Sequence, residues 1–287
     1  MIIGGDKTKV VENIKDLAEK RQLNSKVEVD DPNMSEQEEQ QLLTDFIAER
    51  ATLSYHSKNM IARQGMALAT DILNRQTIVT GAQNIMGIIG GAIVTSNHFN
   101  PLENTAIRYA LKKANNKRLF VISQPTNFKM TGWVGFFLKY ADTLPISRSI
   151  HYMGRTFPTL LQNIFVKNNY VLIYPEKEMW FNYRKPRPFK RGPYYYAARF
   201  NVPIISCFVE MVPQEENDNE QFKQINYKVH ILKPIYPDQN KSNDENSLAM
   251  MQQDYLQKKE AYETAYHTKL TYDFEDGDVV GWNGPKI

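Results

Sequence analysis

The residues best able to do chemistry lie in the segment 96–104, which reads SNHFNPLEN and contains His98 and, five residues later, Glu103. A neutral imidazole is the side chain best suited to take a proton from a hydroxyl near neutral pH. A carboxylate bound to the other ring nitrogen fixes the tautomer and stabilises the imidazolium that forms. These residue types fit a general base, His98, oriented by Glu103, which is the arrangement that acyl transfer to an alcohol requires.

The same spacing has a structural interpretation, and taken alone it favours that interpretation. Asn100 followed by Glu103 is a capping-box pattern, in which Glu103 only closes the start of a helix. Asn100 can serve as N-cap and Pro101 as first helical residue. In either case a helix starts beside His98, and its free N–H groups are expected to hold a thioester carbonyl as it gains negative charge.

The surrounding pattern predicts an α/β fold with a mostly parallel central sheet flanked by helices, because strands alternate with helices of moderate length. His98 follows the first strand of the sheet, and ligands in such folds gather beyond the carboxyl ends of strands. The expected strands are 88–96, 118–123, 144–147, 170–174, 203–209 and 226–232. The expected helices are 11–21, one after the capping box of Ser35 and Glu38, 57–73, 100–114, 128–140, 157–167, 193–200 and 247–270.

Four parts of the chain are predicted. Residues 1–34 form a flexible or loosely packed N-terminal arm, and residues 35–80 form a helical segment. Residues 81–235 form the α/β core, with a polar loop at 212–222, and residues 236–287 form a C-terminal helix and tail.

The composition of the chain excludes several classes of function. The 287 residues carry 35 basic and 32 acidic side chains, and a net charge of +3 is too small to indicate nucleic acid as a partner. Cys207 is the only cysteine, which excludes an internal disulfide and a thiolate metal site. The start, MIIGGDKTKV, has no apolar signal core. The longest apolar run, 85–94, is far shorter than the ~20 residues of a membrane span, so the chain is not expected to cross a bilayer.

Further segments, in order along residues 80–208, make the catalytic interpretation the stronger one. GAIVTSNHFNPLEN (91–104) resembles the first motif of the glycerolipid acyltransferases, the family of 1-acylglycerol-3-phosphate acyltransferases, in which Asn-His is followed after four residues by Asp. LPISR (144–148), LIYPE (172–176) and VPII (202–205) resemble the second, third and fourth motifs. TGAQN (80–84) resembles the stretch that precedes the first.

The resemblance implies roles for individual residues. His98 would be the base and Glu103 its partner, Arg148 would bind the phosphate of the acceptor, and Glu176 would hold its glycerol or shape its pocket. The acyl donor would be acyl-CoA or an acyl carrier protein, and no metal or redox cofactor would be needed. The substrate-binding residues expected on this basis are Asn97, Arg148, Pro175, Glu176, Lys190 and Arg191.

The sequence departs from the family pattern in three places. Glu103 replaces Asp, Lys177 replaces the Gly after Pro-Glu, and Glu178–Met179 replace Thr-Arg. The missing arginine makes the acceptor uncertain. The basic stretch 183–192 (YRKPRPFKRG) follows directly and could replace it as an anion site, although such charge runs are more often solvated surface. Its basic residues are Arg184, Lys185, Arg187, Lys190 and Arg191.

An aromatic group at Trp133, Phe136 and Phe137, flanked by Lys129 and Lys139, is interpreted either as core or as a face that dips into a lipid surface. The second interpretation predicts a cytoplasmic protein bound peripherally to the inner face of the membrane. Three alternatives remain open: acyl transfer to a glycolipid, polyol or cell-wall polymer hydroxyl, a non-catalytic protein that binds lipid or acyl donor, and hydrolysis of a thioester by water. The remaining histidines, including His151 and His230, are expected to lack partners.

Overall fold

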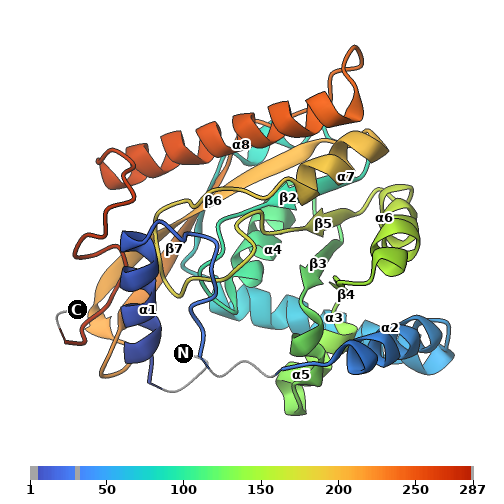
Figure 1. The fold of residues 1–287 in the computed structure, drawn as a ribbon, viewed down its shortest axis with the longest axis horizontal. Helices are drawn as coiled ribbons and strands as arrows, with labels where there is room; N and C mark the ends of the chain where they lie inside the picture. Colours follow the sequence, from blue (N-terminus) through green and yellow to red (C-terminus); the bar gives the residue numbers. More distant parts are fainter. Residues whose placement is uncertain (1–5, 30–32, 286–287) are drawn as a thin grey trace.

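The computed structural model describes residues 6–29 and 33–285. It has a seven-stranded sheet in the order β1-β7-β6-β2-β5-β3-β4, covered by helices on both faces (Figure 1). The five strands β6, β2, β5, β3 and β4 are parallel, and β7 joins them antiparallel through β6. The strands are β1 (Ile78–Thr80), β2 (Ala92–Thr95), β3 (Leu119–Ser123), β4 (Thr143–Pro145), β5 (Tyr170–Leu172), β6 (Ile204–Asn217) and β7 (Lys223–Ile231). The predicted fold class is confirmed.

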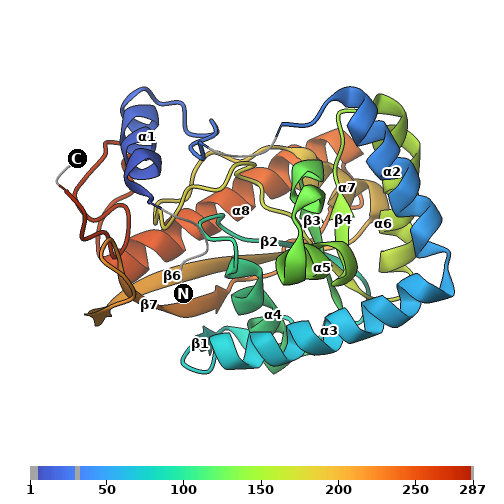
Figure 2. The same ribbon diagram turned by 90° about the horizontal axis from the view of Figure 1, so that it is seen from below.

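Two hydrophobic cores lie on the two faces of this sheet, because successive side chains of a strand point to opposite faces. Ala106 and Ala110 of α4 pack with Val94, whereas Phe157 of α6 and Tyr194 of α7 pack in the core that contains the neighbouring residue of β2, Ile93. Figure 2 shows α3 and α4 on the face turned away from α8. The helices are α1 (Thr8–Glu19), α2 (Glu36–Arg50), α3 (Leu53–Leu73), α4 (Glu103–Ala114), α5 (Gly132–Tyr140), α6 (Phe157–Phe165), α7 (Gly192–Phe200) and α8 (Asn243–Tyr266).

The β6–β7 hairpin is longer than predicted. β6 continues through 212–217, which the sequence predicted as the start of a polar loop, and pairs antiparallel with β7 up to Asn217 and Lys223. This part of β6 is mostly exposed, so its residues carry no alternation of polar and apolar side chains. The hairpin therefore projects past the carboxyl ends of the other strands.

The N-terminal segment differs from the loosely packed arm that the sequence predicted. Val10, Val11 and Ile14 of α1 are at most 1% exposed and belong to a third core with Trp180 and Val279. An amphipathic helix that buries one apolar stripe in this way is held by the hydrophobic effect. Residues 1–5 and 30–32 of the predicted arm, and 286–287 of the tail, lie outside the described residues.

Candidate active site

The parallel strands bring the predicted site residues to one edge of the sheet. β2 ends at Thr95, β5 at Leu172 and β4 at Pro145, and all three run in the same direction. His98, Glu176 and Arg148 each follow one of these ends by three or four residues. β4 lies three strand spacings from β2, roughly 14 Å. The site is therefore an elongated edge with His98 in the middle of the sheet and Arg148 near its margin.

His98 and Glu103 form the predicted pair. Nδ1 of His98 lies in hydrogen-bond contact with Oε1 of Glu103. Oε2 of Glu103 accepts the backbone N–H groups of Phe99 (2.5 Å) and Asn100 (2.9 Å), which fixes the carboxylate in place. Glu103 is 1% exposed, whereas the His98 side chain is 22% exposed. No group in the described part of the chain binds Nε2 of His98, so that nitrogen remains available for a hydroxyl.

Tyr174 is a member of the site that the sequence analysis did not single out. Its ring stacks on the imidazole of His98 at 4.1 Å between centroids, with 6° between the planes. Burial and the adjacent Glu103 carboxylate raise the pKa of Tyr174 well above its usual range, so its phenol remains neutral. The flat contact fixes the plane of the imidazole. Its only sequence signal was the aromatic position before Pro-Glu in the third motif.

Glu176 lies beneath the loop that carries His98 and does not face an open site. It is 1% exposed, and its Oε2 accepts the backbone N–H of His98 (3.3 Å) and the guanidinium of Arg187 (2.8 Å). Arg187, also 1% exposed, donates in addition to the carbonyls of His98 (3.3 Å) and Leu23 (3.1 Å). This buried ion pair therefore positions His98, and Glu176 has no contact surface for the glycerol of an acceptor.

The N-terminal segment completes this support. Asn24 donates its side-chain amide to the carbonyls of Glu176 (3.1 Å) and Pro188 (2.7 Å), and the indole of Trp180 donates to the carbonyl of Ser25 (2.8 Å). Backbone groups tied at both sides of a loop limit its motion. Residues 24–25 therefore hold in place the loop after β5, which includes the end of the third motif at Glu176.

Four backbone N–H groups at the start of α4 have acceptors within the protein, so they are not the free donors that were expected to hold the thioester carbonyl. Those of Phe99 and Asn100 donate to Glu103, that of Leu102 donates to Asn100 Oδ1 (3.0 Å), and that of Glu103 donates to the carbonyl of Asn100 (3.1 Å). A donor already paired has little capacity to stabilise a developing oxyanion.

The two other predicted substrate-binding residues near this loop also have internal partners. Asn97 is 2% exposed and exchanges two hydrogen bonds with the backbone of Val209, at 3.0 and 2.8 Å. Pro175 is buried, and its carbonyl accepts the N–H of Lys190 (2.7 Å). Both residues hold neighbouring segments in register beside His98.

The basic stretch 183–192 is largely neutralised inside the protein. Arg184 and Lys185 pair with the buried carboxylate of Asp278, at 3.1 and 2.7 Å. Arg191 binds Asp244 and Ser247 at the start of α8. Lys190 and Arg148 are exposed, and no described residue pairs with their charged groups. Of the basic residues expected to bind substrate, these two are therefore not paired within the described part of the chain.

Lys177 occupies a backbone conformation that favours glycine. Its φ is +74°, in the left-handed region, at the position where the family motif has Gly. Its side chain is 59% exposed and pairs with Glu178 at 3.1 Å. The turn after Pro-Glu has thus kept its shape although the residue changed, at the cost of local strain.

His230 has partners, contrary to the sequence expectation. Its Nε2 binds Oε2 of Glu210 (2.7 Å), and its Nδ1 binds the hydroxyl of Thr80 (3.1 Å). This cluster lies within β1, β6 and β7. Among the described residues, no group of three or more His, Cys, Asp or Glu side chains is placed to hold a metal ion. Burial raises the pKa of the Cys207 thiol to about 12, so this thiol is inert.

The aromatic side chains of α5 lie partly in the core and partly on the surface. Trp133 is 64% exposed, whereas Phe136 and Phe137 pack against Tyr55 and Ala62. The adjacent α3 exposes further apolar side chains, namely Leu53, Met60, Ile61, Leu68 and Ile72. None of the helices in the described residues is both long enough and apolar enough to cross a bilayer.

Part of the chain matches a known protein family. Residues 76–210 match the family model described as Acyltransferase. This match confirms the resemblance to an acyltransferase that the motifs indicated over residues 80–208. The chain is also similar to the crystal structure of the 1-acyl-sn-glycerophosphate acyltransferase PlsC from Thermotoga maritima, at 13% identity and a TM-score of 0.48, over 81% of this chain and 95% of that one. A comparison with curated protein sequences found no match.

Proposed function

We propose that this protein transfers a fatty acyl group from acyl-CoA or an acyl carrier protein to a hydroxyl of a glycerol-phosphate-type lipid, such as lysophosphatidate. The observation that carries the proposal is the His98–Glu103 pair. Nδ1 of His98 is held by the buried carboxylate of Glu103, and the His98 side chain is 22% exposed, which leaves Nε2 available to a substrate hydroxyl. The acyltransferase family match over the same residues supports the reaction class.

In the proposed reaction, Nε2 of His98 takes the proton of the acceptor hydroxyl while the hydroxyl oxygen attacks the carbonyl carbon of the thioester. Glu103 stabilises the imidazolium that forms. The tetrahedral intermediate then expels the sulfur, the C–S bond breaks, and His98 returns the proton to the departing thiolate. The products are an ester and a free thiol. The base contributes roughly two to four powers of ten in rate.

Charge supports an anionic substrate at this edge. Arg148 and Lys190 are exposed at the carboxyl edge, and a guanidinium binds phosphate through two parallel hydrogen bonds. We assign Arg148 to the phosphate of the acceptor and Lys190 to either substrate. Glu176 and Asn97 act as positioning residues in this scheme, because their side chains are committed within the protein.

We further propose that the protein acts as a peripheral protein on a lipid surface at the inner face of the membrane. The exposed apolar side chains of α3 recur at helical spacing, at 61, 68 and 72, and Trp133 lies on α5, which packs against α3. An exposed apolar face of this kind needs a lipid or protein partner.

The test is an assay with labelled acyl-CoA or acyl carrier protein, lysophosphatidate and lipid vesicles, run with wild type and His98→Ala. Wild type is expected to form phosphatidate, and the variant is expected to lose the reaction while it still binds donor. Free fatty acid in place of ester would indicate a thioesterase. Absence of turnover in wild type with either donor would indicate a binding protein and would overturn the proposal.

A further inference from the structure

The loop after β4, which carries Arg148, lies at the margin of the sheet. In the sheet formed by the described residues, β4 is the last strand, so this loop has a neighbouring strand, β3, on one side only. Figure 2 shows the N-terminal helix α2 at this margin, next to β4. Leu43 of α2 shares a hydrophobic core with Leu144 and Tyr152, which lie before and after the loop. The position of the loop therefore depends on α2.

Glu39 is the residue of α2 that binds the backbone of this loop. It is 8% exposed, and its Oε1 accepts the backbone N–H of Arg148 (2.8 Å) and the hydroxyl of Ser147 (2.5 Å). The oxygen of the Ser147 hydroxyl in turn accepts the backbone N–H of Ser149 (2.9 Å). One carboxylate oxygen thus holds three consecutive residues, directly or through one further hydrogen bond.

The guanidinium of Arg148 takes no part in these contacts. Arg148 is exposed, and no residue in the described part of the chain forms an ion pair with it. Glu39 therefore binds the backbone of Arg148 and leaves the side chain to a ligand. Ordering the backbone of one residue costs roughly the free energy of a tenfold change in a binding constant. A loop that is already ordered spares phosphate binding this cost.

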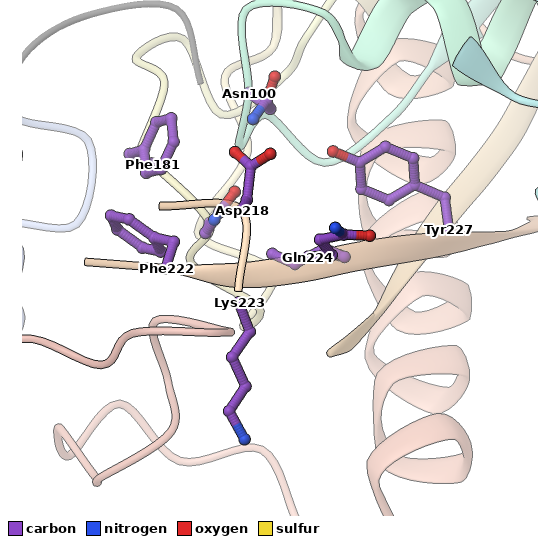
Figure 3. A pocket seen from close by; sticks show the side chains of 9 residues that line it. Asn100, Phe181, Asp218, Phe222, Lys223, Gln224 and Tyr227 are labelled. Atoms are coloured by element: carbon purple, nitrogen blue, oxygen red, sulfur yellow. The ribbon is translucent and has the colours of Figure 1, made fainter. Parts of the chain in front are cut away.

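The pocket next to Asn100, on the β7 side of His98, is less suited to a phosphate (Figure 3). Lys223 lines this pocket, but its ammonium points away from it in Figure 3. Arg148 and Lys190 are not among the described residues that line it. A guanidinium also matches a phosphate with two parallel hydrogen bonds, whereas an ammonium acts as a point charge. The loop after β4 consequently offers the better phosphate site.

We propose that Glu39 is a positioning residue for the phosphate of the acceptor and acts through Arg148. The proposal rests on the proposed acyl transfer. It gives a part in acceptor binding to α2, which lies outside the family match at 76–210. Without the Glu39 contact the guanidinium is still present, but it lies on a loop that is free to move. Phosphate binding is then weaker, while proton transfer at His98 does not depend on the contact.

The experiment compares kcat/KM for lysophosphatidate with kcat/KM for a monoacylglycerol of the same chain, which lacks the phosphate. Glu39→Ala is expected to lower the ratio of the two about tenfold, through KM for lysophosphatidate. Ser147→Ala removes one of the two donors and should lower it severalfold. Glu39→Gln keeps the acceptor oxygen and removes the charge, so its ratio should stay within about twofold of wild type.

Glu38→Ala is the matched control. It removes a carboxylate from the same turn of α2, one that binds Lys129 at 2.8 Å and not the loop after β4, so the ratio should stay as in wild type. A general disturbance of α2 would lower the turnover of both acceptors together. Equal ratios in wild type, Glu39→Ala and Ser147→Ala would overturn the proposal.

A double-mutant cycle tests whether Glu39 acts through Arg148. Arg148→Met is measured alone and combined with Glu39→Ala, with circular dichroism to check the fold. If the two residues act as a unit, Glu39→Ala lowers the ratio in the wild-type background and changes it by less than about twofold in the Arg148→Met background. A further tenfold loss in the double variant would show that Glu39 acts independently of Arg148 and would overturn the proposal.

A binding measurement separates this proposal from the proposed function. Phosphorus NMR follows line broadening of glycerol 3-phosphate without acyl donor. Broadening by wild type and Glu39→Gln that weakens in Glu39→Ala and Arg148→Met supports the positioning role even if no acyl transfer is found, in which case the proposed function alone fails. Absence of broadening by wild type, or equal broadening by wild type and Glu39→Ala, overturns the positioning role.

Discussion

Two histidine–carboxylate pairs lie on this sheet, and they differ in where each histidine sits and in what its second nitrogen does. His98 follows the end of β2, stacks on Tyr174, and binds Glu103 through Nδ1 while Nε2 is unbound in the described part of the chain. His230 lies within β7, and both its nitrogens are bound, by Glu210 and Thr80. The contact with a carboxylate is common to both pairs. A base for catalysis also needs a free nitrogen at the edge where substrates gather.

Removing each carboxylate charge in turn gives the largest expected difference. Glu103→Gln should lower acyl transfer by roughly 10²–10⁴-fold, because the imidazolium loses its stabilising charge. Glu210→Gln should leave the rate within about twofold, because Glu210 and Thr80 already bind both nitrogens of His230 within the sheet. Single-turnover rates, with circular dichroism to check the fold, decide this. Similar losses in both variants would mean that the two pairs do not differ in function.

The cation next to each pair provides the second test. Arg187→Met removes the buried partner of Glu176 and should cost about 3–5 kcal/mol of unfolding free energy. Lys228, 3.6 Å from Glu210 and 36% exposed, is the matched site, and Lys228→Met should cost less than about 1 kcal/mol. Urea unfolding measures both. If the Arg187 variant were as stable as the Lys228 variant, the support of the loop that carries His98 would have to come from other contacts.

A smaller effect is expected where His230 holds the edge strand. Thr80→Val preserves the shape of the side chain and removes the hydrogen bond to His230, with a loss of about 1 kcal/mol in stability. The rate of acyl transfer should stay within about twofold. Hydrogen exchange of β1 amides and the transfer assay are the measurements. A large loss of activity would contradict the purely structural role of this pair.

The smallest expected effect is on stability and comes from backbone strain at Lys177, whose φ is positive. Lys177→Gly should raise stability by about 0.5 kcal/mol, because relief of the left-handed backbone outweighs the added freedom of the unfolded chain. Lys177→Ala is the control, since it removes the same side chain and keeps the Cβ. Thermal unfolding compares them. Equal stability of the two variants would show that the turn is not strained.

The sequence alone was sufficient to predict the features that depend on residues close together in the chain. His98 and Glu103 are five residues apart and follow an apolar strand, so the pair, its strand and its helix could all be inferred. Arg187 could not be assigned, because its partners Glu176 and Leu23 are 11 and 164 residues away. A basic residue has the same appearance in a sequence whether it meets a ligand or a buried carboxylate. The anion site predicted at 183–192 was therefore mostly an internal charge network.

Dependence on partners that are distant in the chain also explains why β1, the second half of β6 and the contacts of Asn97 were not predicted. β1 has three residues and depends on pairing with β7 for its existence, so no periodicity marks it. The distal half of β6 is exposed and polar, and only its partner strand defines it. Asn97 lies in the most recognisable motif, yet its bonds to Val209 depend on strands that are distant in the chain.

The contacts that hold the loop after β5 come from both ends of the chain, and this has a consequence for biosynthesis. Arg187 binds Leu23, 164 residues earlier, and Arg184 binds Asp278, 94 residues later. Because translation delivers residues in order at a finite rate, the nascent polypeptide holds His98 long before Asp278 emerges. The loop that carries His98 should therefore reach its final form in one late step, and incomplete products of translation should lack this support.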